Sequence, residues 1–178
     1  MSNTLVAIAF AAAMASAPQP MPVQFVRGVT GQNVTISIDG KALHTTFAGK
    51  LGFRDANRSW QSVCADVRSP IAGGDTYLVR PMSTTKMGGR VAMAGNIVAK
   101  YFNLARTPDQ CAALQIAVWE AIEDGGDHAD FRNGHLRVRT TQQVMDLAQD
   151  FYEAVREANE AAFLQTGQGG GQGQISTT

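Results

Sequence analysis

The sequence predicts an α+β domain, in which a strand-rich N-terminal half, like a small sandwich or barrel, packs against a mainly helical C-terminal half. β-Branched residues recur in partial alternation before Pro81, which is typical of strands, and apolar residues follow a helical period after Gly89. The chain has 178 residues, of which 44% are hydrophobic and 17% charged. This length and composition suit one domain with a single core.

The strand-rich half is divided into short segments by glycine residues, which stand where strands are expected to reverse. Asp39-Gly40 is a turn signal and indicates a hairpin. The strands are expected over residues 23–29, 34–38, 42–47, 59–67 and 76–79.

The C-terminal half is expected to contain three helices, over 90–104, 108–124 and 141–163, and a short strand over 135–138. Thr107 and Pro108 suit the N-cap and the first position of the second helix, and Gly125-Gly126 suits its end. Apolar residues cover most of the circumference of this helix, so we expect it to be largely buried.

Both ends of the chain differ in composition from the domain, which is expected over 18–165. Residues 1–17 contain an apolar run followed by Ala15-Ser16-Ala17, which predicts a secretory signal peptide. No Lys or Arg precedes the run, so a plain N-terminal helix is the alternative. The run is too short to span a bilayer, which needs about 20 apolar residues, so we expect no membrane insertion after signal removal. The Gly/Gln-rich tail, 166–178, is expected to be disordered.

The charges of the chain balance, with 15 Lys and Arg against 15 Asp and Glu. Such a chain has no overall field that attracts polyanions, so we expect no nucleic-acid partner. We also expect no cofactor.

Gln115 lies between Leu114 and Ile116 in the helix that is expected to be buried. A buried amide without hydrogen-bond partners costs about 1–3 kcal/mol per unsatisfied group. Hydrogen bonds to a neighbouring strand are one explanation for its presence there.

The segment around Gln115 suggests another explanation. Leu114 to Trp119, LQIAVW, resembles the Gln-Trp motif of the thioester domains of bacterial secreted and surface proteins, and also their T-Q-x-A signature with Leu in place of Thr. The upstream Cys motif of that family has its counterpart in Val63-Cys64-Ala65-Asp66, where Val63 replaces an aromatic residue or Leu. The resemblance covers about 23–164 and includes the runs RVAMAGNIVAKYF, CAALQIAVWEAIED, FRNGHLRV and VMDLAQDFYEA.

The resemblance implies an internal thioester between Cys64 and Gln115. The Cys64 thiolate attacks the Gln115 carbonyl and ammonia leaves; an amine of a protein or other surface ligand then attacks the thioester and forms a covalent amide (isopeptide) crosslink. The implied protein is a secreted or cell-surface adhesion domain that acts once, and it is not an enzyme. Trp119, Leu114 and Val118 are expected to pack around the bond and exclude water.

Cys111 provides the main alternative, because it lies four residues before Gln115 and therefore on the same helix face. A Cys64–Cys111 disulfide would consume the thiol. The chain would then be a non-reactive secreted structural or matrix protein of the same fold.

Two further hypotheses concern histidine and acidic residues. A cysteine hydrolase would pair Cys64 with His128 or His135, but neither histidine lies in a recognisable nucleophile motif. The acidic segment EDGGDHAD, with Asp124, Asp127 and Asp130, lacks the spacing of an EF-hand. A solvated loop is therefore expected there, and no metal site.

Overall fold

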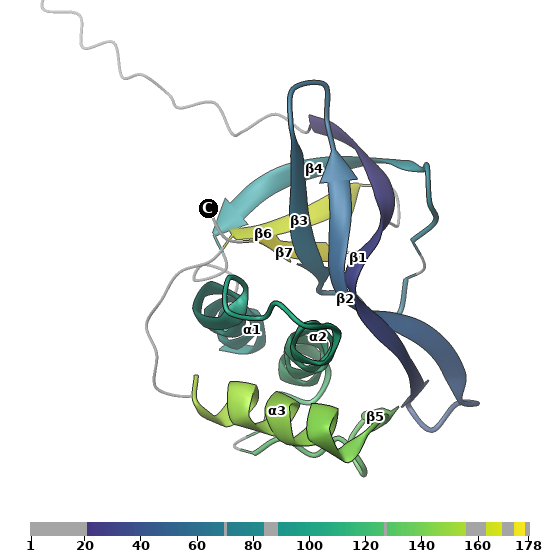
Figure 1. Cartoon of the computed structure of the whole chain (residues 1–178), viewed down its shortest axis with the longest axis vertical. Coiled ribbons are helices and arrows are strands. Elements are labelled where there is room, and N and C mark those ends of the chain that lie inside the picture. The colour runs from purple at the N-terminus through teal and green to yellow at the C-terminus, as the bar shows by residue number, and fades with distance from the viewer. Residues whose placement is uncertain are drawn as a thin grey trace, which may run out of the picture.

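The computed structural model describes residues 21–69, 71–83, 89–126, 128–155, 163–168 and 173–176. The expected signal peptide, 1–17, lies outside these residues. The elements, in chain order, are β1 (Met21–Ile38), β2 (His44–Arg54), β3 (Ser59–Cys64), β4 (Thr76–Ser83), α1 (Gly89–Tyr101), α2 (Pro108–Glu123), β5 (Leu136–Arg139), α3 (Gln142–Glu153), β6 (Phe163–Gln168) and β7 (Gly173–Ser176). Figure 1 shows the curled sheet on one side and the three helices grouped on the other, which confirms the predicted α+β class.

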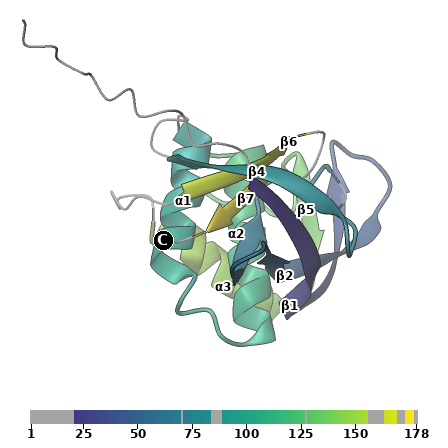
Figure 2. The same cartoon turned by 90° about the horizontal axis from the view of Figure 1, so that it is seen from above.

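The sheet is antiparallel and curls into a barrel. Its strand order is β2-β3-β7-β6-β4-β1-β5, and β1 also pairs with β2, so six strands form a closed circle of pairings. Closure leaves few unpaired strand edges, which protects a sheet from adding further strands. β5 extends the sheet beyond this circle by pairing with the end of β1. Figure 2 shows the strong curvature of β1 and β4.

β1 and β2 form the predicted hairpin, although β1 is one long strand and not two short ones. Its turn is made by Asp39 and Gly40, which both have positive φ angles, 52° and 71°. Further along the hairpin Gly31 faces Gly49. A Cβ atom on Gly31 would lie 2.1 Å from the Ala48 carbonyl oxygen, so the two strands approach too closely there for any side chain.

The C-terminal tail differs from the prediction. Residues 163–168 and 173–176 form β6 and β7, which pair with β4 and β3 and complete the circle of strands. Composition suggested disorder because this segment has few apolar side chains. Strand pairing, however, needs only backbone groups, and the edges of β3 and β4 offer them. The third helix is also shorter than expected, since α3 ends at Glu153.

α2 lies at the centre of the domain and is buried on all sides from Cys111 to Ala121. Thr107 is its N-cap and Pro108 lies at its start, as the sequence predicts. Gln110 completes a capping box with Thr107. One core cluster fills the space between α2 and the sheet, and a second joins α2 to α1 and the end of α3. Within the described residues, no helix has both the length and the apolar character needed to cross a membrane.

Candidate functional site

The structure brings Cys64 and Gln115 together, although 51 residues separate them in the chain. The backbone N–H of Cys64 donates to Oε1 of Gln115 at 2.7 Å, and Nε2 of Gln115 donates to the Cys64 carbonyl oxygen at 2.6 Å. Gln115 is 0% exposed and Cys64 is 3% exposed. The carboxamide is therefore fixed against the backbone of the cysteine, in a setting shielded from water.

The local sequence explains both positions. Cys64 is the last residue of β3, and Gln115 lies in the middle of the buried helix α2. After Cys64 the chain turns, because Oδ1 of Asp66 accepts hydrogen bonds from the backbone N–H groups of Arg68 and Ser69 at 2.8 and 3.2 Å. The thiol of Cys64 donates to the carbonyl oxygen of Asp66 at 3.0 Å. This turn fixes the direction of the cysteine side chain.

A pocket of about 500 Å³ reaches Cys64, while Gln115 lies behind its lining. Cys64 and Trp119 both line it. Its walls are largely apolar, and His44, Thr45, Thr46, Arg68 and Ser69 supply polar groups. A small molecule or a single side chain that enters this pocket therefore reaches the region of the cysteine. The sequence did not identify His44 as a site residue, because nothing in its local pattern indicates a role.

Trp119 packs in the same core cluster as Cys64, whereas Leu114 and Val118 pack in the other one. All three are at most 2% exposed. Among the side chains that the structure describes, none accepts a hydrogen bond from Nε1 of Trp119. The indole thus contributes through its bulk. It packs on the side of α2 that faces Cys64, while Leu114 and Val118 pack on the opposite side of the helix.

Cys111 is not joined to Cys64 in the structure. Its thiol donates to the carbonyl oxygen of Ala105 at 3.4 Å, and it packs in the second cluster, away from that of Cys64. Burial raises the pKa of the Cys111 thiol. Ala105 also accepts from Nζ of the buried Lys50 at 2.8 Å. Cys111 is therefore a buried, protonated thiol with its own partner.

Arg68 connects the turn after Cys64 to two other elements. Its Nε lies 3.0 and 3.1 Å from the carboxylate oxygens of Glu123, at the end of α2, and its guanidinium also pairs with Asp39 in the β1–β2 turn. The hydrogen bond from Arg68 lowers the pKa of Asp39 to about 2. Since Val67 and Arg68 line the pocket, this network holds one of its walls in place.

Glu120, next to Trp119, is a buried carboxyl group. Oε1 accepts from the backbone N–H of Asp130 at 2.7 Å, and Oε2 has no partner among the described residues. Burial raises the pKa of Glu120 to about 7. Glu120 thus joins α2 to the loop that follows it.

His128, His135 and the acidic loop do not join this site. His135 contacts Asp39, with Nδ1 at 3.1 Å from Oδ1, and His128 lies near Glu153. Asp124 accepts hydrogen bonds from the backbone of His135 and Leu136, so its carboxylate shapes the loop. Asp127 lies outside the described residues. Among those that are described, no group of three or more potential metal-binding side chains forms a cluster.

Comparison with known proteins gives one similar structure. No family model matches the chain, and no curated protein matches it significantly. The N-terminal thioester domain of a surface protein from Clostridium perfringens is similar in structure, with a TM-score of 0.49 and 13% sequence identity. The alignment covers 83% of this chain and 99% of that one.

Proposed function

We propose that this domain is a secreted or cell-surface adhesion domain that carries a Cys64–Gln115 thioester and uses it to capture an amine covalently. The observation that carries the proposal is the 2.7 Å hydrogen bond from the Cys64 backbone N–H to Oε1 of Gln115. A carbonyl oxygen gains negative charge when a nucleophile attacks its carbon, and a fixed N–H group at this distance stabilises that charge.

The first step joins the two side chains. The sulfur of Cys64 attacks Cδ of Gln115, the C–N bond breaks, and the amide nitrogen takes up the thiol proton and leaves as ammonia. An amide is a poor acceptor, so the reaction depends on fixed contact, which contributes about 7–11 kcal/mol in well-oriented intramolecular reactions. Two hydrogen bonds to one residue, at 2.6 and 2.7 Å, provide that orientation for the carboxamide.

The second step consumes the thioester. An amine of the partner attacks the same carbonyl carbon, the C–S bond breaks, and Cys64 recovers its thiol proton. The pocket of about 500 Å³ is the route for this amine, and a lysine side chain is a suitable occupant because it is long and has an apolar stem. His44 in the lining is a candidate to accept the proton that the attacking ammonium group must lose. The product is a stable amide, so each molecule acts once.

A second candidate function is a non-reactive secreted structural protein of the same fold. The observation that favours it is the same pair of hydrogen bonds, which satisfies both polar groups of the buried Gln115 side chain without any reaction. In that case the carboxamide serves only to join α2 to the end of β3.

The intact mass of freshly purified protein distinguishes the two functions. A thioester leaves the chain lighter by one ammonia, whereas a disulfide removes only two hydrogens and is reversed by reductant. Methylamine should add to Gln115, which fragmentation of the product locates, and should release one thiol. Cys64→Ala should restore the full mass and abolish the uptake of methylamine.

Cys111→Ala is the matched control, because Cys111 is also buried on α2 but has its own partner in Ala105. This variant should retain both the ammonia loss and the uptake of amine. If neither the native protein nor Cys111→Ala loses ammonia, the thioester does not form and the structural function holds.

The secreted location is part of the proposal and rests on the apolar run before Ala15-Ser16-Ala17. Protein recovered from culture medium should begin near Pro18 when its N-terminus is sequenced. Exported protein that begins at Met1 would contradict removal of a signal peptide.

A further inference from the structure

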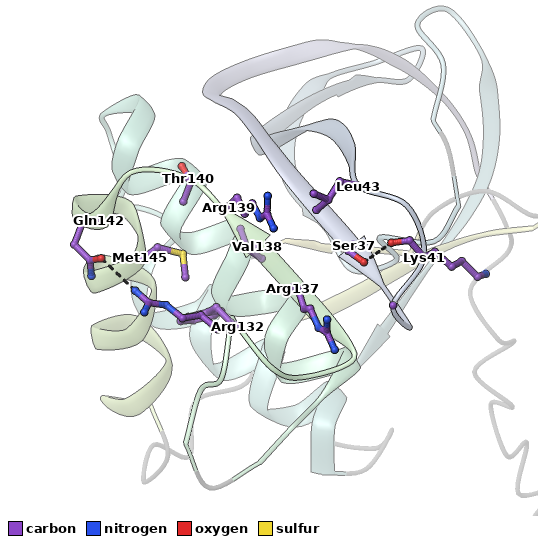
Figure 3. A pocket seen from close by; sticks show the side chains of 12 residues that line it. Ser37, Lys41, Leu43, Arg132, Arg137, Val138, Arg139, Thr140, Gln142 and Met145 are labelled. Carbon is purple, nitrogen blue, oxygen red and sulfur yellow. Dashed lines mark hydrogen bonds between the residues drawn. The ribbon is translucent and has the colours of Figure 1, made fainter.

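A second pocket, of about 570 Å³, shares no lining residue with the pocket over Cys64. It lies between the end of the β1–β2 hairpin, β5 and the start of α3. Its lining contains no carboxylate and includes four cationic residues, Lys41, Arg132, Arg137 and Arg139. Figure 3 shows the two β5 arginines in the centre, between the side of α3 and the side of the hairpin.

Arg137 and Arg139 project from the same face of β5, because alternate residues of a strand point to the same side. Both are exposed, whereas Leu136 and Val138 are buried. Their neighbours across the ladder on β1 are Ser37 and Thr35, which are neutral. Within the described residues neither arginine forms an ion pair.

The acidic residues that are closest in sequence to the lining of this pocket have other partners. Asp39 pairs with Arg68, and Asp146 accepts a hydrogen bond from Gln142. Asp130 accepts hydrogen bonds from backbone N–H groups of the turn that follows it. The chain as a whole has a formal net charge of +0. Arg137 and Arg139 thus have no ion-pair partner among the described residues, and a bound anion would relieve the repulsion between them.

We propose that this pocket binds an extended acidic peptide segment of a protein partner, with carboxylates at alternate positions. Arg137 and Arg139 are two positions apart on a strand, which separates them by about 7 Å. Alternate side chains of an extended peptide have the same spacing, so two Asp or Glu residues separated by one residue meet the two guanidinium groups. Arginine binds carboxylates in planar, two-pronged pairs, which makes this match specific.

The other lining residues favour a peptide over an acidic sugar chain. Leu43, which is 45% exposed, and Met145 also line the pocket and offer apolar contact to the residues between the carboxylates. Phe131 is the aromatic residue of the lining, and it is only 4% exposed. The pocket therefore has no open aromatic face on which a sugar ring would stack.

The test uses Cys64→Ala protein, which cannot form the proposed thioester, so binding here is judged separately from that chemistry. A fluorescent peptide of alternating Glu and Ser is titrated against the protein, and its anisotropy is measured at low and high salt. A peptide with the same composition but its Glu residues in one block tests the spacing, and a sulfated oligosaccharide tests the rival ligand. We expect the alternating peptide to bind most tightly and to weaken at high salt.

Arg137→Glu/Arg139→Glu should weaken the binding of the alternating peptide about tenfold or more, because two attractive pairs become repulsive. Arg27→Glu/Arg106→Glu is the matched control: it changes the net charge equally at two exposed arginines outside the pocket. If the charge-reversed double variant does not fold, Arg137→Gln/Arg139→Gln takes its place. This variant keeps polar side chains on β5 and should also weaken binding of the alternating peptide. Equal weakening in the control double variant, no binding of the alternating peptide, or tighter binding of the sulfated oligosaccharide would each overturn the proposal.

Discussion

The side chain of Gln115 hydrogen-bonds both backbone polar groups of Cys64, the last residue of β3, at 2.7 and 2.6 Å. The pairing of β3 with β2 ends at Ser62, two residues earlier. The two hydrogen bonds from this helix side chain join α2 to the barrel whether or not the two residues react.

This relationship predicts a large effect of Gln115→Leu on stability. The change removes two buried hydrogen bonds to the backbone of Cys64, each of which contributes about 0.5–1.5 kcal/mol. The free energy of unfolding, measured in urea, should fall by a few kcal/mol. The measurement is made in the Cys64→Ala background, which keeps the backbone groups but excludes any crosslink. Gln24→Leu is the control, because that amide is exposed, and an equal loss in both variants would contradict the prediction.

Trp119 is predicted to act through its bulk and not through its N–H group. Trp119→Phe should therefore cost much less stability than Trp119→Ala, which opens a cavity and should lower the free energy of unfolding by about 3–5 kcal/mol. In the Ala variant water reaches the carbonyl of Gln115, so the species that lacks ammonia should hydrolyse faster, as followed by intact mass. Similar losses for Phe and Ala would show that the indole N–H has a partner.

Arg68 is predicted to hold the wall of the pocket over Cys64. Arg68→Ala removes the pairs with Glu123 and Asp39, so the turn after Cys64 should loosen. We expect methylamine to react several-fold faster with this variant, as measured by the rate of its uptake. Arg58→Ala serves as the control, since the Arg58–Asp55 pair lies in an exposed turn. An unchanged rate in Arg68→Ala would show that the wall is fixed by other contacts.

Glu120 predicts a pH dependence of stability. Burial raises its pKa from 4.5 to about 7, so between these values the unfolded chain has lost the proton that the folded chain keeps. The contribution of Glu120 to the free energy of unfolding is therefore complete below about pH 4.5 and is lost as the pH rises toward 7. Above pH 7 this contribution changes no further. The loss amounts to roughly 3 kcal/mol, at about 1.4 kcal/mol for each unit of pKa.

The measurement for Glu120 compares urea unfolding at pH 5 and pH 8. Glu120→Gln keeps an oxygen that accepts from the Asp130 N–H group but does not titrate, so it should lose most of this difference. Asp124→Asn is a control for the neighbouring carboxylate. The prediction is wrong if the free energy of unfolding changes equally between pH 5 and pH 8 in the native protein and in Glu120→Gln. Glu120 would then ionise in the folded protein as it does in the unfolded chain.

Much of this arrangement could be predicted from local sequence. The start of α2 followed from Thr107 and Pro108, and the hairpin turn from Asp39-Gly40, because both depend on residues a few positions apart. Gln115 was singled out as a polar residue in an apolar helix, and its partner Cys64 by motif. The helix start and the turn stand where these local signals place them.

The remainder depends on contacts between distant segments. β6 and β7 form because the edges of β3 and β4 are available, which the Gly/Gln composition of 163–176 does not reveal. His44 joins the pocket only because the hairpin brings it near Cys64. The separation of Cys111 from Cys64 likewise depends on tertiary packing, since the two thiols lie in different core clusters. Helical periodicity shows only that Cys111 and Gln115 are four residues apart on one helix.

The position of Gln115 also determines how the domain would carry mechanical load. In the proposed product the partner is attached in the middle of α2, a helix buried from Cys111 to Ala121 and packed into both core clusters. A pull on the partner then acts on the centre of the fold and not on a terminal strand that peels away residue by residue. α2 leaves both clusters only when they open together, so the tether resists force with the cooperativity of the whole domain.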